Sequence, residues 1–404
     1  MNDNPPTVER PRFLFLCCQV GAEAAVKDEL EREWPRFRFA YSRPGFLTYK
    51  LPAGHDLPAD FDLGLVFARC WGFSLGTVRA PGLAELAHGV WPVYGARPCR
   101  RVHVWPRDAH PVGEHDFEPS ITLEARQAHT AIVKACPQHR ELAEEAHDPL
   151  AEARRGEMVL DCVLVEPDEW WVGYHRAGRP ASRWPGGIPP LRLPPHAVSR
   201  GWLKTEEALR WSELPIPRGA RVVELGSAPG GASQVLLARG FEVTGIDPAA
   251  MHPSVLGEPA FTHLRRRVRQ VRRREFRKAR WLLADMTVAP QFTLDAVEAI
   301  VNHPQVNIRG MLLTLKLLEW HLAAEVPAYL DRIRRWGYNV VLARQLAHNR
   351  QEICVAALMR PFGRKKPERA AAVRPTGRAG RPKRQNAGKG QLPFMRKGGS
   401  SRDN

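Results

Sequence analysis

Short apolar runs alternate with amphipathic stretches through the first part of the chain. The runs have the length and composition of strands and read FLFLC, FLTYK, RVHVW, MVLDCVLV and EWWVGY. Apolar residues recur at helical spacing from Glu23 to Trp34 and around Thr122 to Cys136. The pattern predicts an α+β region over residues 10–178.

Proline and glycine then crowd residues 178–195, GRPASRWPGGIPPLRLPP. Because these residues interrupt both helices and strand ladders, we place a linker at residues 179–197. Beyond the linker, helix-like and strand-like stretches alternate. Helices are predicted at 204–212, from Gly231 onward and at 323–336, and strands at 221–225, 242–246, 281–284, 311–316, 338–344 and 352–359. This rhythm predicts a Rossmann-like, doubly wound α/β domain over residues 198–362.

Composition supports two globular domains and adds one feature, an uneven distribution of charge. The chain has 404 residues, of which 44% are hydrophobic and 25% charged, and its net charge is +17. The segment Arg265 to Arg280 alone is net +9, and Pro361 to Asn404 is net +11. Two concentrated basic segments favour a polyanion partner such as RNA, although a solvated surface and a solubilising tail are the alternative. The tail at 363–404 has few large apolar residues, so we expect it to be disordered alone.

No targeting segment is evident near the start of the chain. The early apolar run from Phe13 to Cys18 is too short for a signal peptide or a membrane span. We therefore expect a cytoplasmic protein with no membrane contact. The seven cysteines form no CxxC pair, which predicts reduced, mostly buried thiols and no metal site.

The sequence VVELGSAPGG, Val222 to Gly231, predicts a strand that ends in a glycine-rich turn and opens a helix. Glycines let a ligand approach the backbone, and the first N–H groups of the helix are free to bind it. The next strand, VTGID, ends in Asp247, which is placed to accept hydrogen bonds from ribose hydroxyls. A nicotinamide dinucleotide is the alternative ligand. However, the GxGxxG spacing is absent, Pro229 lies inside the turn, and Glu224 precedes the first glycine.

The order E-L-G-x-x-P-G-G resembles the first motif of class I methyltransferases, in particular the FtsJ/RrmJ-like ribose methyltransferases. This resemblance implies S-adenosylmethionine as the cofactor. The residues that it implies for cofactor binding are Glu224, Gly226, Ser227, Ala228, Pro229, Gly230, Gly231, Asp247 and Asp285.

The residues after the fourth strand of the α/β region indicate which group is methylated. They read LLADMTVAP and contain a lone Asp285, without the Asn/Asp-Pro-Pro-aromatic box used for exocyclic amines and without a cysteine for covalent attack on a pyrimidine. These features disfavour an exocyclic amine and a pyrimidine carbon, so a hydroxyl remains as the group that is methylated. Methylation of a ribose 2′-hydroxyl needs a base, and a lysine serves when burial and a neighbouring cation lower its pKa.

Two lysines and two acids suit this chemistry by their positions. Asp285 and Lys316 both end predicted strands and should lie at the sheet edge that holds the glycine loop. If the last two strands form an antiparallel turnback, Glu352 begins the final strand at the same edge, and Lys204 precedes the first strand. Singly, each residue could be a surface or strand-end charge. As a set they resemble the K-D-K-E tetrad of ribose 2′-O-methyltransferases, and we expect the pKa of Lys316 to be lowered.

Longer segments resemble the RlmM family, among them FLFLCCQVGAEAAVKDELE, WWVGYHRAGRPASRWPGGIPP and ARQLAHNRQEICV. That family carries a THUMP domain ahead of an FtsJ-like domain and methylates a cytidine 2′-hydroxyl in the peptidyl-transferase region of 23S ribosomal RNA. The resemblance implies that Lys316 is the general base, that Lys204, Asp285 and Glu352 assist it, and that the N-terminal region holds the RNA. Two features depart from the family. The first is the basic segment THLRRRVRQVRRREF, which stands where the family has an acidic residue near the adenine. The second is the tail, which is an addition to the family's pattern.

Two other functions stay open. The first is 2′-O-methylation of another RNA, such as transfer RNA. The second is a non-catalytic RNA-binding factor in ribosome assembly, with a decayed catalytic half. The expected partner is 23S ribosomal RNA or a ribosome-assembly intermediate, and the intact tetrad and glycine loop favour an enzyme.

Overall fold

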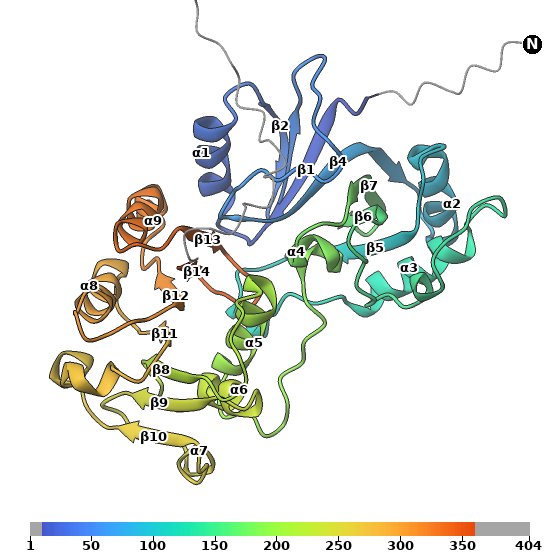
Figure 1. Ribbon diagram of the computed structural model, residues 1–404. Coiled ribbons are helices and arrows are strands. Elements are labelled where there is room, and N and C mark those ends of the chain that lie inside the picture. The colour runs from blue at the N-terminus through green and yellow to red at the C-terminus, as the bar shows by residue number, and fades with distance from the viewer. Residues whose placement is uncertain (1–9, 360–404) are drawn as a thin grey trace, which may run out of the picture. The chain divides into compact units, whose positions relative to one another are not determined.

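The computed structural model describes residues 10–359, which form two seven-stranded sheets within one compact unit (Figure 1). The predicted disordered tail at 363–404 lies outside the described residues. Among those described, no helix combines the length and apolarity needed to cross a bilayer. The cysteines are free thiols and five of the seven are buried, as the absence of a CxxC pair predicted.

The N-terminal sheet is mostly antiparallel, with strand order β2-β3-β1-β4-β7-β6-β5 and one parallel pair, β5 and β6. Its strands are β1 (Phe13–Cys18), β2 (Arg38–Arg43), β3 (Phe46–Lys50), β4 (Ala68–Arg79), β5 (Arg101–Pro106), β6 (Met158–Glu166) and β7 (Glu169–Arg176). Its helices are α1 (Glu23–Glu33), α2 (Leu83–Tyr94) and α3 (Leu123–Lys134), with single turns η1 (Glu114–Asp116) and η2 (Glu144–His147). The α+β prediction for this part of the chain is confirmed.

The second sheet has the order β10-β9-β8-β11-β12-β14-β13. Its strands are β8 (Arg221–Leu225), β9 (Glu242–Ile246), β10 (Phe261–Leu264), β11 (Trp281–Asp285), β12 (Gly310–Lys316), β13 (Val340–Arg344) and β14 (Glu352–Leu358). The five strands β8 to β12 pair in parallel, whereas β14 runs antiparallel to both of its neighbours, β12 and the edge strand β13. The predicted turnback of the last two strands is therefore confirmed.

Alternating residues along the strands of this sheet bury their side chains on opposite faces, as a two-residue period requires. Val222, Leu283 and Leu312 pack with α5 and α6, while Val223, Leu282 and Leu313 belong to the core under α8 and α9. The helices are α5 (Gly201–Ser212), α6 (Gly231–Ala238), α7 (Pro253–Leu256), α8 (Pro290–Val301) and α9 (Val326–Arg335), the last preceded by η6 (Trp320–Glu325). Figure 1 shows α8 and α9 on one side of the sheet and α5 and α6 on the other. The Rossmann-like, doubly wound prediction is confirmed.

The proline- and glycine-rich segment between the two sheets is packed against them. It forms one helical turn, α4 (Pro180–Arg183), followed by the turn η3 (Pro185–Gly187). Trp184 and Ile188 are buried. The segment therefore contributes to the core, and the domain boundaries at 178 and 198 stay predictions.

A buried ion pair ties this segment to the N-terminal sheet. The Arg69 guanidinium makes two hydrogen bonds of 2.8 Å to the Asp108 carboxylate, and its Nε donates to the carbonyl of Gly186 at 2.9 Å. Both side chains are 2% exposed. Burial lowers the pKa of Arg69, but Asp108 opposes this effect and raises the pKa above its ordinary value. The buried positive charge of Arg69 is therefore balanced by the carboxylate of Asp108.

Removal of the partner should destabilise the fold. We predict that Asp108→Asn lowers the free energy of unfolding by about 3–5 kcal/mol, because it leaves the buried guanidinium of Arg69 without a compensating charge. Urea denaturation at neutral pH measures this change. The matched control is Asp331→Asn, whose pair with Arg334 is exposed on α9 and should contribute at most about 1 kcal/mol. Equal losses in the two variants would contradict the prediction.

Candidate active site

Two lysines and two carboxylates form a closed ring at the carboxyl edge of the second sheet. Lys204 Nζ lies 2.5 Å from Asp285 Oδ2 and 2.9 Å from Glu352 Oε1. Lys316 Nζ lies 3.0 Å from Asp285 Oδ1 and 2.5 Å from Glu352 Oε2. Each carboxylate thus contacts both lysines, and the formal charges of the ring sum to zero. The four residues predicted from the sequence are all brought together here.

The topology explains this convergence. Asp285 and Lys316 are the last residues of parallel strands β11 and β12, so both lie at the same sheet edge. Because β14 runs antiparallel to β12, its first residue, Glu352, pairs directly with Lys316 in the strand register. Lys204 comes from α5, which packs beside α6. Three strands and one helix therefore position the ring.

The pKa of Lys316 differs from the sequence prediction. Burial lowers it, as expected, but the carboxylates of Asp285 and Glu352 together raise it above the ordinary value of 10.5. The prediction of a lowered pKa was wrong because it gave the neighbouring Lys204 more weight than two carboxylates in direct contact. Burial raises the pKa of Asp285, but the two lysines outweigh this and lower it. At neutral pH Lys316 is therefore an ammonium group and Asp285 a carboxylate.

The glycine loop lies between β8 and α6, where the sequence placed it. Gly226 has φ +79°, and a Cβ atom there would lie 2.4 Å from the carbonyl oxygen of Asp285. Only glycine lets the loop pass so close to the end of β11. Glu224, buried at the end of β8, accepts a hydrogen bond of 2.6 Å from Ser233 Oγ. Burial raises the pKa of Glu224 to about 8, and Ser233 lowers it only in part.

Asp247 holds the glycine loop from the end of β9. Its Oδ2 accepts a hydrogen bond of 3.2 Å from the Ala228 N–H, and its Oδ1 accepts one of 2.8 Å from the Ala249 N–H. The carboxylate therefore connects the loop to the turn after β9. Remaining lone pairs on its two oxygens are available for a ligand.

A cavity of about 310 Å³ joins the ring to the glycine loop. Its walls include nine of the predicted site residues, namely Lys204, Glu224, Gly226, Ser227, Ala228, Gly231, Asp285, Lys316 and Glu352. Three predicted cofactor residues, Pro229, Gly230 and Asp247, lie next to these residues in the loop and strand but outside the walls. The sequence prediction missed Ser199, Arg200, Gly201, Ala232, Thr287 and Arg350. The one sequence feature that could have identified them is proximity along the chain, since each lies within five residues of a predicted site residue.

These residues suit a nucleoside cofactor that carries a positive charge. Gly226 passes close to β11 and lines the cavity with its backbone. The first residues of α6 also line the cavity, so the N-terminus of this helix faces the ligand site. Glu224, Asp285 and Glu352 supply carboxyl groups in or at the same cavity. A cationic ligand would favour the ionised form of Glu224, whose pKa is raised first by burial and then by the carboxylates of Asp285 and Asp247.

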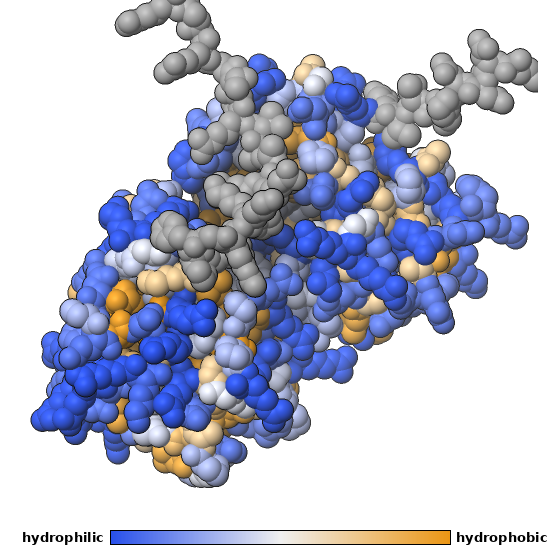
Figure 2. Space-filling model, in the orientation of Figure 1, coloured by the Kyte–Doolittle hydropathy of each residue, from blue (hydrophilic) through white to orange (hydrophobic). Residues whose placement is uncertain are grey.

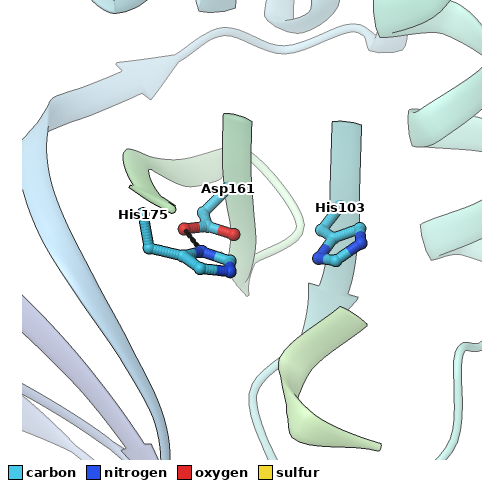
Figure 3. Close-up of side chains that lie close together, drawn as sticks. All are labelled: His103, Asp161 and His175. Carbon is cyan, nitrogen blue, oxygen red and sulfur yellow. Dashed lines mark hydrogen bonds and ion pairs between the residues drawn. The ribbon is translucent and has the colours of Figure 1, made fainter. Parts of the chain in front are cut away.

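One group of described residues outside this cavity has side chains of the metal-binding type. His103 on β5, Asp161 on β6 and His175 on β7 place their ligand atoms within 4.8 Å of one another (Figure 3). Two metal bonds of about 2.1 Å span at most about 4.2 Å. Instead, His175 Nδ1 lies 2.7 Å from Asp161 Oδ2, and its Nε2 lies 2.7 Å from the Ser182 carbonyl oxygen. Both ring nitrogens of His175 are therefore engaged by protein oxygens.

The basic segment from Arg265 to Arg280 follows β10 at the edge of the second sheet. It forms two short turns, η4 (Val268–Gln270) and η5 (Arg273–Phe276), that are anchored by the buried side chains of Val271 and Phe276. Most of its arginines are exposed, before, between and after these two anchors. In Figure 2 the surface around this segment is strongly hydrophilic. The segment thus presents a fixed row of cations to solvent.

The fold, together with the lysine–carboxylate ring and the glycine loop, defines a class I methyltransferase of the FtsJ type. The family model described as FtsJ-like methyltransferase matches residues 197–345, and such enzymes use S-adenosylmethionine.

More specifically, the chain belongs to the family of ribosomal RNA large subunit methyltransferase M and is an RNA methyltransferase. The member from Halorhodospira halophila is 35% identical over 356 residues, which cover 85% of this chain and 96% of that protein. The member from Alkalilimnicola ehrlichii is 36% identical over 193 residues, 45% of this chain and 50% of that protein. A solved structure of TrmN from Thermus thermophilus is 14% identical in sequence, and the alignment covers 86% of this chain and 99% of the TrmN chain. Its TM-score is 0.33, which is too low to support a conclusion about fold or function.

Asp247 should be important for cofactor affinity. We predict that Asp247→Ala weakens S-adenosylmethionine binding about ten- to a hundredfold, because loss of a charge-assisted acceptor costs about 1.5–3 kcal/mol. The variant leaves the Ala228 and Ala249 amides unpaired and releases the glycine loop. Calorimetric titration measures the change. Glu242→Gln, at the other end of β9 in an exposed pair with Arg221, is the control and should bind normally. Unchanged affinity in Asp247→Ala would exclude this residue from the site.

Proposed function

We propose that the protein transfers the methyl group of S-adenosylmethionine to a ribose 2′-hydroxyl of 23S ribosomal RNA, at a cytidine of the peptidyl-transferase region. The observation that carries the proposal is the closed ring of Lys204, Asp285, Lys316 and Glu352 in one cavity with the glycine loop. The proposed setting is the cytoplasm, where the RNA is free or part of a ribosome-assembly intermediate.

Lys316 is the proposed general base, and the geometry supports this choice over Lys204. The Lys316 side chain is 20% exposed and that of Lys204 is 11% exposed, so Lys316 is the more accessible to an incoming hydroxyl. S-adenosylmethionine, when bound, supplies an electrophilic methyl group. Loss of a proton from Lys316 would leave Asp285 and Glu352 paired with Lys204, so the carboxylates would keep a cationic partner. Lys204 thus stabilises the ring while Lys316 accepts the hydroxyl proton.

The N-terminal sheet and the basic segment are proposed to hold the RNA. The sheet is the region predicted to contain a THUMP-type domain, and it contacts the catalytic half through Gln19, which donates hydrogen bonds to the carbonyls of Leu346 and Asn349 at 2.9 Å and 2.7 Å. Exposed arginines between residues 265 and 280 supply affinity that depends on salt and not on sequence.

The identity of the RNA can be tested directly. Methylated riboses are mapped in total RNA from a deletion strain and from the same strain complemented with the gene. The proposal expects one methylation to disappear from 23S ribosomal RNA and to return on complementation. Loss from a transfer RNA would establish the alternative substrate, and no loss from any RNA would favour a non-catalytic assembly factor.

Removal of the proposed base should abolish turnover without abolishing binding. We predict that Lys316→Met lowers single-turnover methylation by at least a factor of about 10² to 10⁴, the usual contribution of a positioned base. Affinities for cofactor and RNA should change little, since the proton is accepted only during the reaction. Lys134→Met, at the exposed end of α3, is the control. Near-normal turnover in Lys316→Met would refute the assignment, and turnover lost together with cofactor binding would indicate a damaged site.

The pH dependence of the rate should report the raised pKa of Lys316. Below that pKa, each unit of pH raises the neutral fraction of the amine tenfold. Because Asp285 and Glu352 hold the pKa above 10.5, we predict that the logarithm of the single-turnover rate rises with a slope near one from about pH 7 to about pH 10. Asp285 stays ionised throughout, since its pKa is lowered. A plateau below about pH 9 would show that the base is another group or that proton transfer does not limit the rate.

A further inference from the structure

One cation in the active-site cavity has no partner among the described residues. The walls contain four basic side chains, Lys204, Lys316, Arg200 and Arg350. Both lysines are paired within the ring, and Arg200 donates a hydrogen bond of 2.7 Å to the Glu118 carboxylate. The Arg350 guanidinium makes no hydrogen bond or ion pair with any residue between 10 and 359. Because Lys204, Lys316 and Arg200 have carboxylate partners, Arg350 is the basic side chain of these walls whose charge is unmatched within residues 10–359.

The backbone that carries Arg350 is held on both sides. Glu207 of α5 accepts hydrogen bonds of 2.8 Å from the amides of Ala347 and His348. The carbonyl of Arg350 itself accepts a hydrogen bond of 3.0 Å from Gln345 Nε2. The loop between β13 and β14 is thus fixed just before Glu352 enters the ring. The backbone of Arg350 is therefore fixed, and its side chain is exposed at the cavity.

A glycine from the N-terminal half lies against the guanidinium. Gly113 has φ +84°, and a Cβ atom there would lie 2.5 Å from Arg350 Nε and 2.7 Å from Arg350 Cζ and Nη2. Absence of a side chain at residue 113 is therefore what lets this loop cover the guanidinium. The loop also supplies Glu118, the partner of Arg200. The loop from the N-terminal half thus contacts Arg350 and Arg200 from behind, while the residues that line the cavity itself come from the second half.

We propose that Arg350 binds the phosphodiester on the 3′ side of the ribose that is methylated. This inference rests on the proposed 2′-O-methylation. The 2′-hydroxyl and the 3′-oxygen are on adjacent carbons, so a hydroxyl placed at the ring brings its own 3′-phosphate into the same cavity. That phosphate carries a full negative charge and needs a donor, and a planar guanidinium can bind two of its oxygens at once. Arg350 is the binding residue that remains available there.

Substitution of Arg350 should weaken RNA binding and leave the chemical step intact. In single-turnover methylation of unmodified 23S ribosomal RNA, Arg350→Gln should raise the RNA concentration for half-maximal rate about tenfold and change the maximal rate little. The slope of log affinity against log salt should fall by about one. Arg350→Lys should recover part of the affinity, because an ammonium can still bind phosphate as a point charge. Arg218→Gln, exposed before β8 at the opposite edge of the sheet, is the matched control.

Removal of the charge from the RNA tests the same contact from the other side. Full-length RNA is ligated with one methylphosphonate, which is uncharged, either 3′ or 5′ to the target nucleotide. The nucleotide before that linkage is 2′-deoxy, because a free 2′-hydroxyl would attack the uncharged phosphorus and cleave the chain, and RNA binding is the measurement. The 3′ substitution should weaken the wild type about tenfold and Arg350→Gln not at all, while the 5′ substitution should affect both proteins equally. A full 3′ penalty that persists in Arg350→Gln, or normal RNA affinity and salt slope in that variant, would overturn the proposal. If the wild type methylates no ribosomal RNA, the proposed function fails, and the salt slope of binding still decides whether Arg350 contacts phosphate.

Discussion

Electroneutrality of the lysine–carboxylate ring is the constraint on which the rest of the site depends. Two ammonium groups are tolerated at a partly buried sheet edge only because Asp285 and Glu352 each contact both of them. This balance requires residues from α5, β11, β12 and β14, and therefore fixes the ends of all four elements. The same two carboxylates raise the pKa of Lys316, which is opposite to the shift expected from the sequence. The proposed base is consequently held in the protonated form, and its neutral fraction depends on the surrounding carboxylates.

Contacts between the two halves of the chain serve the same ring. Glu207, one turn after Lys204 on α5, holds the loop that leads into Glu352, and Gln19 at the end of β1 holds that loop from the other side. The hydrophobic cores support this arrangement, since one cluster includes residues of the N-terminal sheet and of the face under α8 and α9. The first half, which is proposed to hold the RNA, and the catalytic half are therefore joined by a set of fixed backbone atoms.

The sequence predicted the catalytic half more completely than the N-terminal half, for a physical reason. Parallel strands buried on both faces appear as continuous apolar runs, so β8 and β9 were placed at their observed bounds. In contrast, β4 contains two glycines, and α2 contains Pro92, so neither shows a clean period and both were missed. The ring residues were found because topology brings strand ends together. The partners of Lys316 were identified, but the sign of its pKa shift depends on distances of 2.5–3.0 Å that no sequence pattern contains.

The position of β14 has a consequence for how the enzyme becomes active during folding. This last strand of the described chain inserts between β12 and β13, so until it docks each of them presents an open edge to solvent. An intermediate without it would also hold two ammonium groups against a single carboxylate. Closure of the sheet and neutralisation of the ring are thus the same event. A partly folded chain without β14 would therefore lack Glu352, one of the two carboxylates that balance the lysines.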